Sequence, residues 1–238
     1  MSTFVLIPGA GGGPWSWHLV EAELRAHGHD VVVVDLPCDD DSAGLAEYLD
    51  AALGAIGSRR DRDDLVLVGH SMGAFTAVLL CDRIPARVLV LVAAMIPAPG
   101  EAPGDWWEHT GFPAARAAQV ERDGGDDSPE TTFLHDLPPA VAAASGDHIR
   151  EQSGTPFEAP FPIEEWPPVV TRVLLCTEDR FFPVDFQRRV TQERLGIVPD
   201  EMVAGHLPML GHPEELASRL EAYAAEASTG QHGSHGAL

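Results

Sequence analysis

One stretch, residues 65–75 (LVLVGHSMGAF), constrains the fold of this chain more than any other. An apolar run leads into the pattern Gly-x-Ser-x-Gly, and a helical pattern begins at once. At a strand-to-helix junction this pattern predicts a tight turn that holds the serine hydroxyl out from the edge of a sheet, a nucleophile elbow. Gly69 and Gly73 supply the small residues that the crowded backbone needs around Ser71. The simpler alternative is an ordinary turn in which this serine has no chemical role.

The rest of the chain alternates between apolar runs and helical patterns. This alternation predicts an α/β fold, a mostly parallel sheet of about six strands with helices on both faces. The expected strands are residues 4–7, 31–34, 65–68, 88–92 and 172–176, with a short last strand within 197–203. Helices are expected at residues 15–27, 42–56, 72–83 and 184–195, and a closing helix is expected from Pro213. Residues 1–95 and 169–227 together form the expected core.

Residues 96–168 differ in composition from the two flanking parts, and we expect them to form an inserted cap. This segment is rich in Pro, Ala, Gly and acidic residues and lacks strand patterns. Its many aromatic side chains argue against a long disordered loop. Among them, Trp106, Trp107 and Phe133 are the expected substrate-binding residues. Residues 228–238 are expected to form a disordered tail.

Composition narrows the classes of partner. Asp and Glu number 37 against 15 Lys and Arg, and the resulting net charge of -22 should repel nucleic acid and anionic membranes. Cys38, Cys81 and Cys176 are widely spaced, so neither a disulfide framework nor a zinc site is expected. The first residues lack a basic region, and no apolar run approaches the ~18 residues of a membrane span. We therefore expect a cytoplasmic protein without metal or organic cofactor. The sequence leaves open whether it is a monomer or a homodimer.

A serine nucleophile needs a base within hydrogen-bond reach and an acid that orients this base. In open parallel sheets such residues follow the carboxyl ends of strands, and after this motif the chain order is serine, acid, histidine. For the acid we favour Asp179, just after the strand at 172–176, because the fourth strand is followed only by Ala93 and Ala94. For the base we favour His206, in the loop after the last strand.

Other residues could take these roles. Glu178 and Asp185 are alternatives for the acid, and His212 is an alternative for the base. His212 directly precedes Pro213, however, where a helix-capping role is the simpler interpretation. Asp35, at the end of the second strand, is explained more simply by hydrogen bonds to loop backbone.

A glycine-rich loop, PGAGGGP at residues 8–14, follows the first strand. It matches neither of the glycine-rich phosphate-binding patterns, so nucleotide binding is not expected. A loop of this kind lets backbone rather than side chains face a substrate. When an acyl oxygen gains negative charge in a transition state, preorganised backbone N–H groups stabilise it. We expect these oxyanion donors to be Met72, directly after the serine, and Ala10 in the glycine-rich loop.

Three blocks of sequence resemble the α/β-hydrolase superfamily, in particular the plant methylesterase and hydroxynitrile-lyase group and its bacterial esterase relatives. The blocks are IPGAGGGPWSWH at 7–18 with GHDVVVVDLP at 28–37, GHSMGA at 69–74, and TEDRFFP at 177–183 with GHLPML at 205–210. The resemblance covers about residues 3–226 and implies a lid over the pocket. It also implies a catalytic triad with two oxyanion donors, namely Ser71, Asp179, His206, Ala10 and Met72.

The chain also departs from this group. Relatives usually have His-Gly where this chain has Pro8-Gly9, and the lyases carry a lysine and a threonine where this chain has Leu207 and Ala10. Cyanohydrin cleavage is therefore not expected. The leading hypothesis is a serine hydrolase that cleaves a small-molecule carboxylic ester through an acyl-enzyme. The alternatives are a thioesterase or carbon–carbon bond hydrolase of a biosynthetic pathway, and a hydrolase-fold small-molecule binding protein with little turnover.

Overall fold

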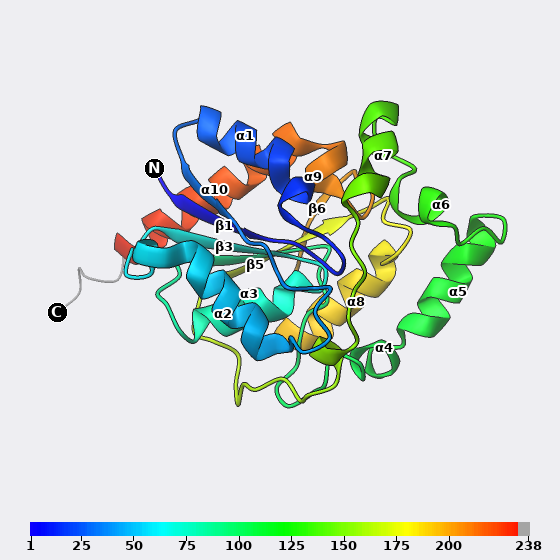
Figure 1. Ribbon diagram of the computed structural model, residues 1–238, viewed down its shortest axis with the longest axis horizontal. Coiled ribbons are helices and arrows are strands. Elements are labelled where there is room, and N and C mark those ends of the chain that lie inside the picture. Colours follow the sequence, from blue (N-terminus) through cyan, green and yellow to red (C-terminus); the bar gives the residue numbers. More distant parts are fainter. Residues whose placement is uncertain (233–238) are drawn as a thin grey trace.

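A six-stranded parallel sheet lies at the centre of the computed structural model, which describes residues 1–232 (Figure 1). The strands are β1 (Thr3–Ile7), β2 (Asp30–Val33), β3 (Leu65–His70), β4 (Val88–Val92), β5 (Thr171–Cys176) and β6 (Asp200–Met202). Their order across the sheet is β2-β1-β3-β4-β5-β6, and every neighbouring pair is parallel. The expected α/β class and all six expected strands are confirmed.

Helices cover both faces of this sheet, as Figure 1 shows. They are α1 (His18–Ala26) and α10 (Pro213–His232) on one face, and α2 (Leu45–Ile56), α3 (Gly73–Cys81) and α8 (Val184–Leu195) on the other. Side chains alternate between the two faces along each strand. Phe4 and Leu6 of β1 therefore pack on the α1 and α10 side, whereas Val5 and Ile7 pack on the α2 and α3 side. The two resulting apolar cores fix the sheet that carries the site.

The expected helices are present, and some of them start at other residues than expected. The helix expected at 15–27 opens with a 3-10 turn, η1 (Pro14–Trp17), before α1. Helix α2 starts at Leu45 rather than Ser42, because Gly44 precedes it with its N–H bonded to the Glu47 carboxylate at 2.8 Å. A second 3-10 turn, η2 (Gly57–Arg59), follows α2. Helix α8 spans the expected residues.

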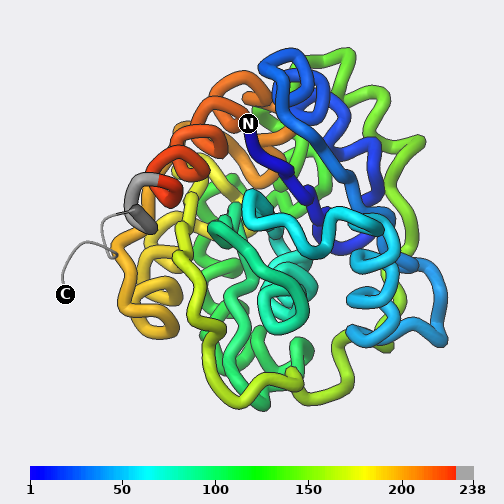
Figure 2. Tube along the Cα trace, turned by 90° about the vertical axis from the view of Figure 1, so that its left-hand side faces the viewer, coloured from blue at the N-terminus to red at the C-terminus, as the bar shows by residue number. Residues whose placement is uncertain are grey.

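We call residues 96–168, between β4 and β5, the cap segment. Its helices are α4 (Trp106–His109), α5 (Phe112–Arg122), α6 (Pro129–Phe133), α7 (Pro139–Ser145), and the 3-10 turns η3 (Gly146–His148) and η4 (Thr155–Phe157). Helices α5, α6 and α7 lie at one end of the molecule, opposite the N-terminus (Figure 1). Figure 2 turns the molecule so that the end with the N-terminus faces the viewer. The bounds of the core and of the cap as separate units stay predictions.

The closing part of the chain is more regular than the sequence indicates. After the short α9 (Pro208–Gly211), helix α10 continues to His232. The expectation of a tail from Ser228 is therefore wrong as far as His232, because the helical backbone carries on through these residues. The remainder of that expected tail, 233–238, lies outside the described residues. None of the helices within residues 1–232 is both long and apolar enough to cross a membrane.

Candidate active site

Ser71 occupies a strained turn directly after β3. Its φ angle is +50°, which is uncommon for a residue with a side chain. Such a conformation costs on the order of 1–3 kcal/mol and persists only where the surroundings fix it. Here the end of β4 fixes it, because the Ser71 N–H donates to the Val92 carbonyl at 3.1 Å and the Met95 N–H donates to the Ser71 carbonyl at 3.0 Å. The turn thus holds the serine in one defined position.

The two glycines around this serine are required by space. A Cβ atom at Gly69 would lie 2.8 Å from the Ala74 Cα, and one at Gly73 would lie 2.8 Å from the Ile7 carbonyl oxygen. Both distances are shorter than real Cβ contacts, and the atoms met are backbone atoms that cannot move aside. The expectation that the turn needs small residues at these two positions is confirmed.

The structure brings together the three side chains that the sequence analysis favoured. His206 Nε2 lies 3.2 Å from Ser71 Oγ, and His206 Nδ1 lies 2.8 Å from Asp179 Oδ2. Ser71 follows β3, Asp179 follows β5 and His206 follows β6, so the carboxyl ends of three parallel strands deliver the set to one edge of the sheet. None of the three is more than 6% exposed. Water therefore has little access to the line of hydrogen bonds that joins them.

Asp179 is held by the loop that follows it. Its Oδ1 accepts the backbone N–H groups of Phe181 and Phe182, both at 2.8 Å, and its Oδ2 faces His206. Gln187 Nε2 also donates to Oδ2, at 3.4 Å. These donors satisfy the buried carboxylate and fix its direction, which leaves one oxygen to accept the proton on His206 Nδ1.

The alternative residues lie elsewhere. Glu178 is exposed, and Asp185 pairs with Arg188 at 2.7 Å on the surface, with 91% of its side chain exposed. His212 lies 3.7 Å from Asp136 of the cap segment, and its carbonyl accepts a hydrogen bond from α10. None of the three alternatives contacts Ser71 in the described part of the chain. The sequence-based preference among the candidates agrees with this geometry.

His70 is a neighbour of the site that the sequence analysis missed. Its Nε2 donates to the His206 carbonyl at 2.8 Å, and the two rings lie 4.9 Å apart. Burial, together with the nearby His206 ring, lowers the pKa of His70 to about 3, so this ring is neutral near pH 7. The available signal was its position between Gly69 and Ser71. His70 fixes the backbone of the loop that carries His206.

Among the backbone N–H groups near Ser71, those of Ala10 and Met72 have no hydrogen-bond acceptor within residues 1–232. The glycine-rich loop folds back on itself, with the Gly12 N–H on the Gly9 carbonyl at 3.1 Å. It passes close to the serine, since a Cβ at Gly9 would lie 3.0 Å from the Ser71 Cβ. The two groups expected to be oxyanion donors are therefore without a hydrogen-bond partner in the described part of the chain, and their role stays a prediction.

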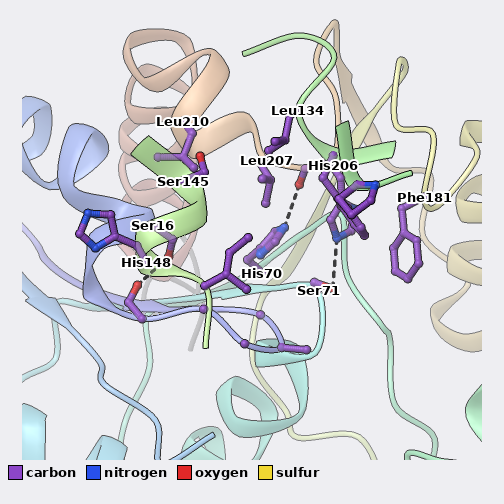
Figure 3. A pocket seen from close by; sticks show the side chains of 18 of the residues that line it. Ser16, His70, Ser71, Leu134, Ser145, His148, Phe181, His206, Leu207 and Leu210 are labelled. Atoms are coloured by element: carbon purple, nitrogen blue, oxygen red, sulfur yellow. Dashed lines mark hydrogen bonds between the residues drawn. The ribbon is translucent and has the colours of Figure 1, made fainter. Parts of the chain in front are cut away.

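A cavity of about 280 Å³ adjoins Ser71 and His206. Figure 3 shows these two residues and Phe181 on one side of it, and Ser16 and His148 on the other. Its walls come from both the core and the cap segment and are mainly apolar. They include Trp15, Met95, Trp107, Phe133, Leu134, Ile149, Phe157, Phe181, Leu207 and Leu210. No Asp, Glu, Lys or Arg lines the cavity within the described residues.

Comparison with known proteins places this fold and site in a family. The model of the "Alpha/beta hydrolase family" matches residues 4–219, which is most of the chain. The chain belongs to the alpha/beta hydrolase family. The resemblance inferred from the three sequence blocks is thereby confirmed.

The relatives of this α/β hydrolase include plant proteins with several names. Methylesterase 7 of Arabidopsis thaliana is 29% identical over 251 residues, covering 91% of this chain and 94% of the relative. Norfluorocurarine synthase 1 of a Strychnos species is 24% identical, covering 92% and 93%. The crystal structure of polyneuridine aldehyde esterase matches with a TM-score of 0.76 and 23% identity, covering 93% of this chain and 98% of that one. This structural likeness bears on the fold alone.

The three aromatic residues expected to bind substrate in this α/β hydrolase differ in position. Trp107 and Phe133 line the cavity, and the Phe133 ring lies 5.5 Å from the His206 ring. Trp106 does not line it: the side chain is fully buried, and its indole N–H donates to the Ile96 carbonyl at 2.9 Å. The structure therefore does not support a substrate contact for Trp106, which packs instead against Phe182.

The Met72 side chain is 4% exposed and packs within the apolar core. Cys38, Cys81 and Cys176 are free thiols. In the part of the chain that the structure describes, no group of three His, Cys, Asp or Glu side chains is arranged to hold a metal ion.

Proposed function

We propose that this α/β hydrolase is a serine esterase that cleaves small, uncharged carboxylic esters through an acyl-enzyme. The observation that carries the proposal is the line from Ser71 Oγ through His206 to Asp179, with distances of 3.2 Å and 2.8 Å, at the wall of an apolar cavity. The name of one relative, methylesterase 7, supports ester hydrolysis over other acyl chemistry.

In the first half of the reaction, Ser71 Oγ attacks the ester carbonyl while His206 Nε2 takes the hydroxyl proton. The carbonyl oxygen becomes an oxyanion, which the N–H groups of Ala10 and Met72 stabilise. Asp179 keeps the proton of His206 on Nδ1 and stabilises the imidazolium. The tetrahedral intermediate then collapses: the bond to the alkoxy oxygen breaks, the alcohol leaves with the proton from Nε2, and the acyl group stays on Ser71.

In the second half, His206 Nε2 removes a proton from a water molecule as its oxygen attacks the acyl carbon. The second tetrahedral intermediate releases Ser71 Oγ, which recovers its proton from His206. The sum is one ester and one water converted into one acid and one alcohol.

The cavity selects for an uncharged substrate. Its hydroxyl groups are already engaged as donors, because Ser16 Oγ donates to the Gly13 carbonyl at 2.8 Å and Ser145 Oγ donates to the Val141 carbonyl at 2.9 Å. A charged group buried against these walls would have no counter-ion, at a cost of several kcal/mol or more. An apolar acyl group in a cavity of about 280 Å³ loses no such interaction.

A panel of neutral and charged p-nitrophenyl esters, with matched thioesters, tests the proposal. We expect many turnovers per molecule on short neutral esters, and loss of at least about 10⁴-fold in kcat for Ser71→Ala. Esters carrying a carboxylate or an ammonium group in the acyl part should react poorly. Saturable binding of the esters without turnover would instead favour a binding protein, and a preference for thioesters would favour a thioesterase.

A further inference from the structure

A short part of the cap segment, residues 149–153, is hydrogen-bonded to the glycine-rich loop. The Gly11 N–H donates to Gln152 Oε1 at 3.1 Å, and the Gly11 carbonyl accepts the Arg150 N–H at 2.9 Å. The two segments are in close contact, since a Cβ at Gly11 would lie 2.6 Å from the Arg150 carbonyl oxygen. Both polar backbone groups of the residue next to Ala10 are thus bonded to the cap segment.

The Arg150 side chain adds a second point of attachment. Its Nη2 donates to the Gly12 carbonyl at 2.9 Å, to the Leu36 carbonyl at 3.1 Å and to Asp35 Oδ1 at 2.9 Å. The side chain is 29% exposed, so these charge-assisted bonds are partly shielded from water. Arg150 therefore joins the glycine-rich loop to the segment that follows β2. This contact also gives Asp35 a role outside the reaction.

Gln152 is itself held in one orientation. Its Nε2 donates to the Tyr48 hydroxyl on α2 and to the Ser153 carbonyl, both at 3.0 Å. The Ser153 N–H donates to the Cys38 carbonyl at 2.7 Å, which anchors the chain next to the glutamine. With its amide nitrogen bonded in this way, Gln152 presents its oxygen to Gly11.

We propose that Gln152 and Arg150 are positioning residues for the reaction: they hold the glycine-rich loop so that the Ala10 N–H stays directed at the developing oxyanion. The inference rests on the proposed function, which gives Ala10 its role. Within the loop, the N–H of Gly11 and that of Gly12 have acceptors, whereas that of Ala10 has none in residues 1–232. Ala10 lines the cavity, and fixing the two peptide groups that follow it restricts how far its own N–H can turn.

The start of this part of the cap segment, together with the residue before it, lines the cavity next to Ser71. His148 and Ile149 line the cavity, and the His148 ring stacks on Trp15 at 4.4 Å. A substrate that packs against these side chains therefore contacts the segment that holds the glycine-rich loop. Because an oxyanion exists only in the transition state and the intermediates, loss of this support should lower kcat more than it raises KM.

The test compares Gln152→Met, Arg150→Ala and Arg150→Lys with wild type. Met keeps the shape of the glutamine side chain but provides no amide oxygen for the Gly11 N–H, and lysine keeps N–H donors that alanine lacks. We expect Gln152→Met and Arg150→Ala to lower kcat about 10- to 100-fold with KM within about threefold of wild type. Labelling of Ser71 by a fluorophosphonate should slow by a similar factor. Arg150→Lys should recover a large part of the loss.

The matched control is Gln119→Met, which changes another cap glutamine whose side-chain bonds run only to Asp123 and Arg122. It should keep the kinetics of wild type. A kcat equal to that of wild type in both Gln152→Met and Arg150→Ala, or an effect on KM alone, would overturn the inference. As long as wild type turns over substrate, either result leaves the proposed function standing. Absence of turnover in wild type would reject the proposed function itself. If Gln152→Met does not fold, the comparison of Arg150→Ala with Arg150→Lys tests the inference.

Discussion

Asp179 combines near-complete burial with a full set of hydrogen-bond donors. It is 3% exposed, and its two oxygens meet the N–H groups of Phe181 and Phe182, the Gln187 amide and His206. A buried carboxylate is tolerable only when it is bonded in this way. At this position, the negative charge selects the His206 tautomer whose Nε2 can accept the Ser71 proton.

Asp179→Asn tests that role with little change of shape. An asparagine amide donates to His206 Nδ1, which places the ring proton on Nε2 and removes the base from Ser71. By analogy with known serine hydrolases, we expect kcat to fall about 10⁴-fold. Steady-state rates on a neutral p-nitrophenyl ester measure this, with the melting temperature as a check of folding. A rate within tenfold of wild type would contradict the assignment.

His70 links folding stability to pH. Because burial lowers its pKa to about 3, against 6.5 for an ordinary histidine, the unfolded chain binds more protons between these values. Stability from this group is therefore complete above pH 6.5 and is lost as the pH falls toward 3. His70→Gln keeps an N–H for the His206 carbonyl and removes the titration. Between pH 7.5 and 5, urea titration should show wild type losing about 2 kcal/mol more than the variant. Equal losses would reject the prediction.

Single residues also show what could be predicted from sequence. The proximity of Ser71, Asp179 and His206 was predictable because each follows an expected strand, and parallel strands bring such positions to one edge. Trp106 was not, because its burial depends on contacts with Phe182, which is distant in sequence. Composition cannot distinguish an aromatic ring in a wall from one in a core.

At the scale of elements, the unit formed by β3, the turn at Ser71 and α3 is the most tightly constrained. The positive φ angle of the serine is maintained by hydrogen bonds to residues just after β4 and by the absence of side chains at Gly69 and Gly73. The local sequence pattern predicts the turn and the two glycines of this unit. The end of β4, where Ala93 also has a positive φ angle of +42°, contributes in a way that no local pattern indicates.

Gly73→Ala tests the crowding at the start of α3. The added Cβ would lie 2.8 Å from the Ile7 carbonyl oxygen, so strand and helix must separate. We expect a loss of roughly 1–3 kcal/mol in the free energy of unfolding. Gly54→Ala, in α2 with open space around the position, is the matched control and should stabilise by roughly 0.5–1 kcal/mol. Equal effects of the two substitutions would show that helix propensity, not crowding, governs Gly73.

At the scale of the whole molecule, the cap segment is joined to the core by contacts between residues far apart in the chain. Arg194 of α8 makes a two-pronged ion pair with Glu101, at 2.5 and 2.8 Å, and also donates to the Ile96 carbonyl at 2.7 Å. Arg150 and Gln152 make corresponding contacts with the glycine-rich loop. The sequence predicts an inserted segment, but such pairings depend on the folded arrangement and are not predictable from it.

Glu101→Gln measures the strength of this connection. The side chains of Arg194 and Glu101 are 13% and 7% exposed, so the substitution leaves a buried guanidinium without its counter-ion. We expect a loss of about 3 kcal/mol in the free energy of unfolding. Glu193→Gln, which removes the exposed pair with Arg189, serves as control and should cost less than about 1 kcal/mol. Urea unfolding followed by circular dichroism gives both values, and equal small losses would refute the expectation.

The activated serine is tested most directly by fluorophosphonate labelling followed by intact-mass measurement. Wild type should gain one adduct per chain, Ser71→Ala should gain none, and His206→Ala should react far more slowly. A folded wild-type protein that remains unlabelled, or a Ser71→Ala variant that labels as fast as wild type, would contradict the assignment of Ser71 as the nucleophile.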